Sequence, residues 1–192
     1  ENKQFSGSFE LLQCDVSNEF QVVSLFEKIS ADYQYLDILV NNAGIRRDAM
    51  LALMNYKDWQ DVLDTNLTGT YLMAKHAVLL MMQHKFGRII NITSPVARLG
   101  FSGQANYAAS KAGQVALTKT LAKEVARKKI TVNCVSPGFI STDFIADLDQ
   151  DLVAEYKKMI PMRRFGTPGE VADSVLFLAS KRASYISGAV LE

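Results

Sequence analysis

The sequence has 192 residues, of which 48% are hydrophobic and 21% charged, and its formal net charge is +1. These values are typical of one folded domain and argue against a disordered chain. The small net charge favours neither nucleic acid nor an anionic membrane as a partner. No apolar run approaches the roughly 18 residues that a membrane span needs. We therefore expect a single domain in the cytoplasm, with no nucleic-acid partner and no membrane contact.

Short apolar runs alternate with longer amphipathic segments, the pattern of βαβ units on a parallel sheet. Ser17 is a plausible N-cap for the first helix, and Thr65–Gly69 interrupts the second. The elements expected in chain order are a strand at 9–14, a helix at 17–33, a strand at 36–40, a helix at 56–84, a strand at 88–93, a helix at 105–128, a strand at 130–135, helices at 149–159 and 168–180, and an apolar run at 188–192.

The two cysteines, Cys14 and Cys134, lie in strand-like runs and lack the spacing of metal ligands. We interpret them as buried free thiols rather than as disulfide partners. A reducing, cytoplasm-like compartment fits this interpretation, and we expect no metal site.

Both ends of the predicted sheet look incomplete. The strand at 9–14 lies almost at the start of the chain, yet a sheet that buries such strands should have neighbours on both sides. The apolar run at 188–192 stops without a turn. We therefore expect a sheet that continues beyond both ends of this sequence.

Tyr107 and Lys111 are four residues apart in a predicted helix, so their side chains project from one face. An ammonium beside a phenol favours the phenolate and lowers its pKa from about 10 toward neutral pH. Such a phenol can donate a proton to a carbonyl oxygen as a hydride arrives, or accept one in reverse. Alone, a pair at this spacing is most often two surface residues.

Three further segments support the pair. Ser94 follows the strand at 88–93, where chemistry gathers in open α/β sheets, and its hydroxyl can polarise a carbonyl. Asn41-Asn42-Ala43-Gly44 follows another strand; its small residues let the backbone approach a flat ligand, and its asparagines brace neighbouring strands. Asn66 falls in the helix interruption and could hold a water. Singly, these segments read as a turn serine, a strand-to-loop turn and a solvated asparagine.

Together these residues stand in the order and spacing of the short-chain dehydrogenase/reductase family. The chain resembles that family's central and C-terminal three-quarters, through 41–44, Asn66, Ser94, Tyr107, Lys111 and 137–138. The resemblance implies an α/β fold with a Rossmann-like doubly wound parallel sheet. It also implies hydride transfer between a nicotinamide cofactor and a carbonyl or alcohol.

The resemblance assigns roles to these residues. Tyr107 is the general acid/base, and Ser94 orients the carbonyl. Lys111 binds the nicotinamide ribose and lowers the tyrosine pKa, while Asn66 completes a proton relay through a water. The cofactor-binding residues that it implies are Asp15, Val16, Asn41, Ala43, Gly44, Tyr107, Lys111, Pro137, Gly138, Ile140 and Thr142.

The resemblance also bears on Asp15 and on the helix that follows Thr142. Asp15 matches an adenine-contacting aspartate, although an acid at a helix N-terminus explains it equally well. The charged helix after Thr142 would be a mobile substrate lid.

Longer phrases resemble the bacterial-type 3-oxoacyl-(acyl-carrier-protein) reductases, namely 41–48, 87–92, 106–113, 132–143 and 164–172. In that subfamily, basic residues near the active-site rim receive the acidic carrier protein. Lys85 and Lys128 occupy the matching positions, although surface lysines more often serve only solubility. Pro95 departs from the family's small or β-branched residue and leaves the acyl-chain preference open. The resemblance also implies a homotetramer.

The family's glycine-rich T-G-x-x-x-G-x-G turn, which seats a pyrophosphate at a helix N-terminus, does not occur in the sequence. Neither does the residue that separates NADP from NAD. Because the match begins at about the family's third strand, we interpret the first β-α-β unit as truncated, as removed by proteolysis, or as lying outside this sequence, and not as evidence of another fold.

Three functional hypotheses follow. The first is NADPH-dependent reduction of 3-oxoacyl groups on acyl carrier protein to 3-hydroxyacyl groups in fatty acid biosynthesis, with NADH not excluded. The second keeps the family but places a CoA thioester, sugar, quinone or alcohol in the site. The third, of another class, is a non-catalytic fragment that only oligomerises.

Overall fold

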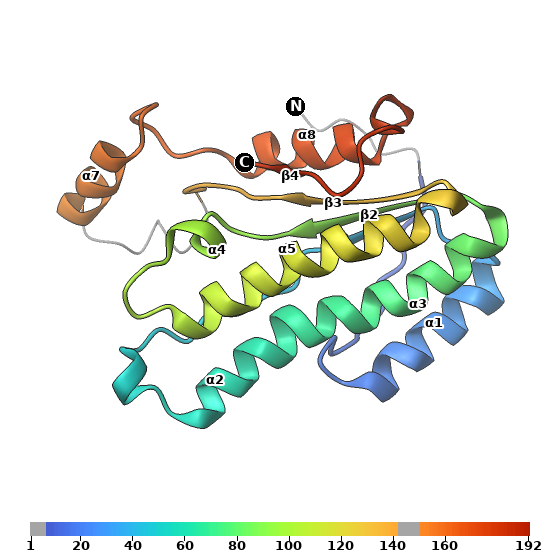
Figure 1. Ribbon diagram of the computed structural model, residues 1–192, viewed down its shortest axis with the longest axis horizontal. Helices are drawn as coiled ribbons and strands as arrows, with labels where there is room; N and C mark the ends of the chain where they lie inside the picture. Colours follow the sequence, from blue (N-terminus) through green and yellow to red (C-terminus); the bar gives the residue numbers. More distant parts are fainter. Residues whose placement is uncertain (1–6, 142–149) are drawn as a thin grey trace.

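A computed structural model describes residues 7–141 and 150–192 of the chain and shows an α/β fold with helices on both faces of a parallel sheet (Figure 1). The strands pair in the order β1-β2-β3-β4, and every pairing is parallel. Their bounds are β1 Ile38–Asn41, β2 Gly87–Ile92, β3 Ile130–Val135 and β4 Val190–Leu191.

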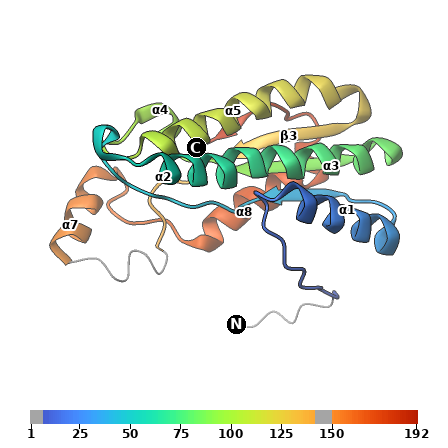
Figure 2. The same ribbon diagram turned by 90° about the horizontal axis from the view of Figure 1, so that it is seen from below.

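Helices connect each strand to the next, as parallel pairing requires. The α-helices are α1 Glu19–Tyr33, α2 Tyr56–Leu63, α3 Gly69–His84, α4 Val96–Leu99, α5 Ala105–Val125, α7 Gln150–Met159 and α8 Pro168–Ala179. Shorter helical turns are η1 Leu51–Leu53, η2 Asp64–Thr68, η3 Ala126–Lys128 and η4 Lys181–Ala183. Seen from below, α1, α3 and α5 lie side by side over one face of the sheet, while α8 covers the other (Figure 2). The predicted doubly wound architecture is therefore confirmed.

Adjacent residues of β2 serve the two faces, because side chains alternate along a strand. Ile89 packs with α1, α3 and α5 in the larger apolar cluster, which includes Met81 and Val132. Ile90 packs with Leu178 of α8 in the smaller one. Both isoleucines are almost completely buried, so β2 is the central strand on which the two helical layers meet.

A chain of buried polar side chains crosses the sheet near its carboxyl edge. Asn41 in β1 donates from Nδ2 to Asn91 Oδ1 in β2 at 2.8 Å. Asn91 donates in turn to Thr118 Oγ1 in α5 at 2.8 Å, and that hydroxyl lies 3.1 Å from Cys134 Sγ in β3. Four elements are thus held in register by hydrogen bonds among buried groups, and the expected bracing by asparagine is confirmed for Asn41.

The predicted break in the long helix is a π-helical turn, η2, between α2 and α3. Such turns shift the hydrogen-bond ladder by one residue and often occur at functional sites. The break turns Asn66 inward, where it is completely buried. The interruption read from the sequence is confirmed.

Two local predictions were wrong. Residues 9–14 form no strand in the structure, because no neighbouring strand among the described residues pairs with them; Phe9 and Leu11 are exposed. The N-cap of α1 is Asn18, whose side chain accepts from Gln21 N, and not Ser17. Cys134 is a buried free thiol as expected, whereas Cys14 is only partly buried.

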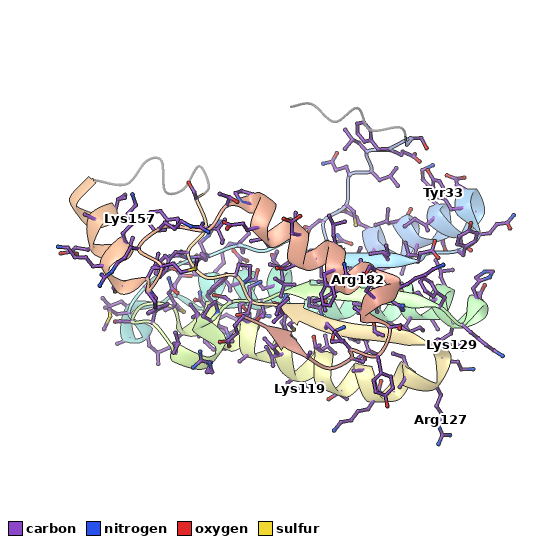
Figure 3. The ribbon with its side chains drawn as sticks, turned by 90° about the horizontal axis from the view of Figure 1, so that it is seen from above. Tyr33, Lys119, Arg127, Lys129, Lys157 and Arg182 are labelled. Atoms are coloured by element: carbon purple, nitrogen blue, oxygen red, sulfur yellow. The ribbon has the colours of Figure 1, made fainter. Side chains whose placement is uncertain are left out.

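Within the described residues, no helix combines the length and apolarity needed to cross a membrane. Charged side chains such as Lys119, Arg127 and Lys157 project outward from different elements (Figure 3). The cations labelled in that view do not gather into a single basic patch.

Replacing the centre of the polar chain should destabilise the fold. Asn91→Leu leaves the amide of Asn41 and the hydroxyl of Thr118 without their present partner, and each buried unsatisfied group costs about 1–3 kcal/mol. We expect a loss of about 2–5 kcal/mol in the free energy of unfolding, measured by urea denaturation. The control Asn42→Leu, at the exposed neighbour of Asn41, should change it by less than about 0.5 kcal/mol. Equal effects of the two substitutions would contradict this account.

Candidate active site

The predicted site residues meet where three parallel strands end. Asn41 is the last residue of β1, Ser94 follows β2 by two positions, and Pro137 follows β3 by two. The first turns of α5 carry Tyr107 and Lys111 across this edge. Because all three strands run in one direction, their carboxyl ends necessarily lie along the same border of the sheet.

Ser94 and Tyr107 are directly linked, since the side chain of Ser94 hydrogen-bonds the phenol. The turn that carries Ser94 is fixed locally, because Val96 N donates to Ser94 Oγ at 3.3 Å. It is also tied to α5, because Thr93 Oγ1 donates to the backbone carbonyl of Lys111 at 3.0 Å. Two hydroxyl groups from separate elements are thereby held together.

Burial raises the pKa of Tyr107 above its ordinary value, because the phenolate would lose hydration. The hydrogen bond from Ser94 and the positive charge of Arg46 lower this pKa, and the negative charge of Asp48 raises it. The net result is a raised pKa, so the lowering toward neutral pH predicted from the spacing of Tyr107 and Lys111 is not found in this structure. Tyr107 therefore carries its proton at neutral pH and can act as a donor.

Lys111 is only 4% exposed, and its Nζ donates to the carbonyl of Ile92 at 2.7 Å. Nζ also lies 5.6 Å from the centre of the Tyr107 ring. Burial of the ammonium lowers the pKa of Lys111 to about 8. The expected juxtaposition of lysine and tyrosine is therefore present, with a lysine that loses its charge in mildly alkaline solution.

The side-chain amide of Asn66 is fully engaged in hydrogen bonds with neighbouring segments. Its Oδ1 accepts from Ile45 N at 2.8 Å, and its Nδ2 donates to Ile45 O at 3.0 Å and to Ser110 Oγ at 3.1 Å. Its backbone carbonyl accepts from Thr70 Oγ1 and Gln114 Nε2, both at 2.7 Å. These contacts join η2 to α5 and to the loop after β1; the expected relay through a water stays a prediction.

The backbone at Gly44 lies close to the buried groups of the site. A Cβ at this position would stand 3.3 Å from Asn66 Oδ1 and 3.6 Å from Lys111 Nζ. A side chain there would be tight against Asn66 and in ordinary contact with Lys111, so the glycine marks a point where the backbone closely approaches the site.

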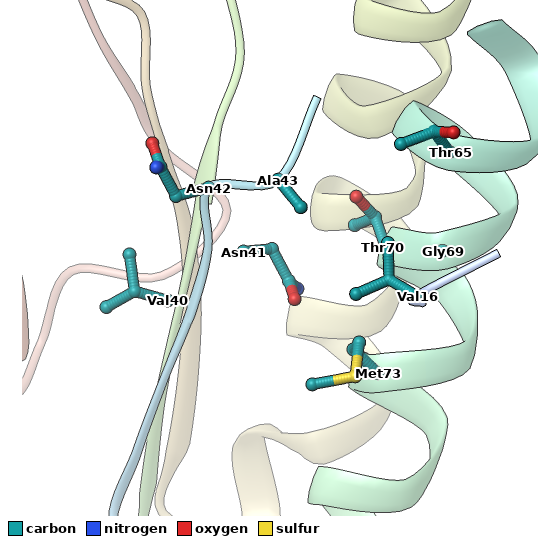
Figure 4. Close-up of a pocket in the computed structure, with 9 residues that line it drawn as sticks. All are labelled: Val16, Val40, Asn41, Asn42, Ala43, Thr65, Gly69, Thr70 and Met73. Atoms are coloured by element: carbon teal, nitrogen blue, oxygen red, sulfur yellow. The ribbon is translucent and has the colours of Figure 1, made fainter. Parts of the chain in front are cut away.

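A shallow hollow opens beside this loop, between β1 and the start of α3 (Figure 4). Asn41 points toward α3 in this view, whereas Val40 points to the other side of the strand. The hollow is lined by Val16, Val40, Asn41, Asn42, Ala43, Thr65, Gly69, Thr70 and Met73. It brings together three of the predicted cofactor contacts, Val16, Asn41 and Ala43.

Asp15 adjoins this hollow in sequence, but its carboxylate is engaged locally. Its Oδ1 accepts from Ser17 N at 2.9 Å and from Ser17 Oγ at 2.7 Å, which lowers the pKa of Asp15. These bonds come from Ser17, just before the N-cap Asn18 of α1, so the carboxylate closes a local turn next to the helix start. The expected contact of Asp15 with adenine stays a prediction.

The segment after β3 leaves the same carboxyl edge of the sheet. Ile140 pairs with Gly166 in an isolated parallel bridge, and Phe139 stacks on Tyr156 of α7 with ring centres 5.2 Å apart. Pro137, Gly138 and Ile140 line a second hollow. Thr142 lies outside the described residues.

Lys85 and Lys128 do not border this site within one copy of the chain. Lys85 precedes β2 and Lys128 precedes β3, so both lie at the amino ends of these strands. The six residues of β2 span roughly 20 Å at about 3.3 Å per residue, and the predicted catalytic residues lie at the far end. The expectation that they lie near the active-site rim is not met within a single chain.

Sequence reasoning missed three residues that shape the site. Asn106 is completely buried and donates to the carbonyls of Arg47 at 2.9 Å and Asp58 at 3.2 Å. Arg46 and Asp48 form an ion pair beside Tyr107. The position of Asn106 directly before Tyr107 could have pointed to it in the sequence. Nothing in the sequence pointed to the position of Arg46 and Asp48 beside Tyr107, because it depends on how a distant loop folds against α5.

Comparisons with known proteins agree with this geometry. A family model described as enoyl-(acyl carrier protein) reductase matches residues 2–192. The chain is 46% identical to the 3-oxoacyl-(acyl-carrier-protein) reductase of Aquifex aeolicus over 94% of this chain and 73% of that protein. Proteins of the same name from Chlamydia pneumoniae (46%) and Escherichia coli (45%) match 96% and 94% of this chain, and 75% and 74% of their own lengths.

Lys111 makes the stability of the protein depend on pH. Its pKa is about 8 in the folded chain, against 10.5 ordinarily, so between these values the unfolded chain holds a proton that the folded chain releases. Stability of the wild type therefore rises with pH across that window, and below it the buried ammonium is a cost. We expect Lys111→Met to raise the unfolding free energy at pH 7 by about 1–3 kcal/mol.

This gain should shrink as the pH rises from 8 to 10.5, which urea denaturation at several pH values would measure. The matched control is Lys119→Met on the exposed face of the same helix (Figure 3), which should keep the wild-type pH dependence. If Lys111→Met gains the same unfolding free energy over the wild type at pH 7 and at pH 10.5, the lowered pKa of Lys111 is contradicted.

Proposed function

Because the chain belongs to the short-chain dehydrogenase/reductase family, we propose that it reduces 3-oxoacyl groups on acyl carrier protein to 3-hydroxyacyl groups. The family implies a nicotinamide cofactor, and we propose NADPH. The enzyme is thus an NAD(P)-dependent oxidoreductase that acts in fatty acid biosynthesis. The observation that carries the proposal is the hydrogen-bonded pair of Ser94 and Tyr107, held beside the buried ammonium of Lys111 at the carboxyl edge of the sheet.

The residues present fit a nicotinamide cofactor. The ammonium of Lys111 has three N–H donors, and one of them donates to the carbonyl of Ile92. The remaining donors suit the two hydroxyls of a ribose. The backbone at Gly44 leaves room next to this ammonium, and the hollow at Val16 and Asn41–Ala43 suits the adenosine end. Pro137, Gly138 and Ile140 would contact the nicotinamide.

The chemistry requires one hydride and one proton for each carbonyl reduced. The nicotinamide, when bound, supplies the hydride. Tyr107 supplies the proton from its phenol to the ketone oxygen, and Ser94 donates a hydrogen bond to the same oxygen, which disperses the charge that develops there. Lys111 stabilises the phenolate left behind. Asn66 would hold η2 and the loop at Ile45 in place for this arrangement, and it would pass the returning proton through a water.

The description of the family model and the names of the relatives point to different substrates, a carbon–carbon double bond in one and a ketone in the other. The geometry supports the ketone. Two hydroxyl donors from different elements converge, which suits the oxygen atom at the reacting centre of a ketone. In an enoyl thioester the oxygen that takes up the charge is on the thioester carbonyl, two carbons away from the carbon that receives the hydride.

The acyl carrier protein would deliver the substrate, and copies of the chain would assemble into a homotetramer. The relatives are named for substrates on an acyl carrier protein, and we extend this partner to the present chain. Lys85 and Lys128 remain candidate contacts for the acidic carrier; since they lie away from the site in one chain, they would serve a site on another copy of a homotetramer.

The test is turnover of acetoacetyl thioester, measured through the absorbance of NADPH and of NADH at 340 nm. We expect oxidation of NADPH with acetoacetyl thioester and little with crotonyl thioester.

Tyr107→Phe should lower kcat by about 10³-fold or more while cofactor binding, measured by fluorescence, persists. Ser94→Ala should lower kcat by about 10²-fold. Full activity in Tyr107→Phe would exclude the mechanism, and preference for crotonyl, sugar or quinone substrates would exclude the proposed substrate.

A further inference from the structure

An arginine lies close to the catalytic tyrosine. The guanidinium carbon of Arg46 lies 6.0 Å from the centre of the Tyr107 ring. Arg46 belongs to the loop after β1, whereas Tyr107 belongs to α5. Only the fold brings the two side chains together.

This guanidinium is held in position by neighbouring side chains. Arg46 Nε donates to Asp48 Oδ1 at 3.3 Å, and its Nη2 is paired with Asp48 Oδ2. Asp48 Oδ2 also accepts from Gln104 Nε2 at 3.0 Å, which links the loop to the start of α5. The two-point contact with one carboxylate restricts the planar guanidinium more than a single hydrogen bond would.

The backbone of the same loop is fastened to α5 independently. Asn106, the residue before Tyr107, donates to the carbonyl of Arg47. Asn66 clamps the adjoining peptide of Ile45 on both its N–H and its carbonyl. The loop is therefore anchored on both sides of Arg46, at Ile45 by Asn66 of η2 and at Arg47 by Asn106 of α5.

The other cation at the site has a charge that varies with pH. Burial lowers the pKa of Lys111 to about 8, so a growing share of Lys111 is neutral as the pH rises above neutral. Arginine keeps its charge throughout this range. Arg46 is more exposed than Lys111, so its charge costs less to maintain.

We propose that Arg46 is a positioning residue for catalysis, which supplies a pH-independent positive charge that stabilises the phenolate of Tyr107. This inference rests on the proposed function. When Tyr107 gives its proton to the ketone oxygen, the phenol O–H bond breaks and the alcohol O–H bond forms. The phenolate then carries the negative charge until water returns a proton, and the charge of Arg46 favours that state.

The charged and titratable groups described around Tyr107 act in both directions. Arg46 favours the phenolate and Asp48 opposes it, while Nζ of Lys111 on α5 lies 5.6 Å from the centre of the ring. Tyr156 of α7 also interacts electrostatically with Arg46. Because Asp48 both holds Arg46 and opposes the phenolate, its substitution would mix two effects; Arg46 itself is the residue to change.

The test is the titration of Tyr107 with and without this cation. Tyrosine labelled with ¹³C at Cζ reports phenolate formation by NMR, and Tyr107→Phe identifies the signal. We expect the titration midpoint in Arg46→Gln to move to higher pH, and Arg46→Lys to restore part of the shift. Arg47→Gln is the matched control, because Arg47 Nη1 donates to the carbonyl of Arg46 instead of facing Asp48; it should leave the midpoint unmoved.

Turnover provides the second measurement. Oxidation of 3-hydroxybutyryl-CoA with NADP⁺ requires the phenolate as base, so Arg46→Gln should lower kcat at pH 7 by about tenfold and move the pH profile to higher pH. KM should remain nearly unchanged. An unmoved NMR midpoint in Arg46→Gln, or a change in KM alone, would overturn the inference. Absence of turnover in the wild type would instead refute the proposed function, and the NMR titration would still decide the role of Arg46.

Discussion

The burial of one ammonium group, that of Lys111, is the constraint on which the rest of this site depends. Lys111 sits almost out of contact with solvent between α5 and the end of β2, with the carbonyl of Ile92 as its hydrogen-bond acceptor. A charge in such a position is costly unless neighbouring groups compensate it. The chain nevertheless places it next to the phenol of Tyr107, where the proposed function would use it at the expense of stability.

The surroundings keep that arrangement rigid through hydrogen bonds between distant segments. The chain from Asn41 through Asn91 to Thr118 aligns the strands under the site. The π-turn at η2 turns Asn66 inward, where its amide fixes the loop after β1 against α5. Each of these groups is buried, so the loss of one partner leaves another unsatisfied. The same network of buried hydrogen bonds therefore holds both the site and the carboxyl edge of the sheet in place.

Much of the fold followed from local patterns. β3 was predicted to the residue, and α1, α5 and α8 within a few residues, because apolar spacing and turn residues report directly on a strand or helix. The segment 9–14 failed for a physical reason: a strand exists only when a partner strand satisfies its backbone. The apolar composition of that segment could not report whether such a partner was present.

The sequence by itself determined that Tyr107 and Lys111 share a helix face, since a spacing of four residues fixes their relation through helix geometry alone. It also identified Ser94 and the segment 41–44 as strand ends. Only the tertiary structure decided how these groups meet. The pairing of Arg46 with Asp48 beside Tyr107, the depth of Lys111, and the separation of Lys85 and Lys128 from the site all depend on how strands and loops pack. Distances between residues far apart in the chain, and the burial that shifts their pKa values, are properties of packing and have no local pattern to reveal them.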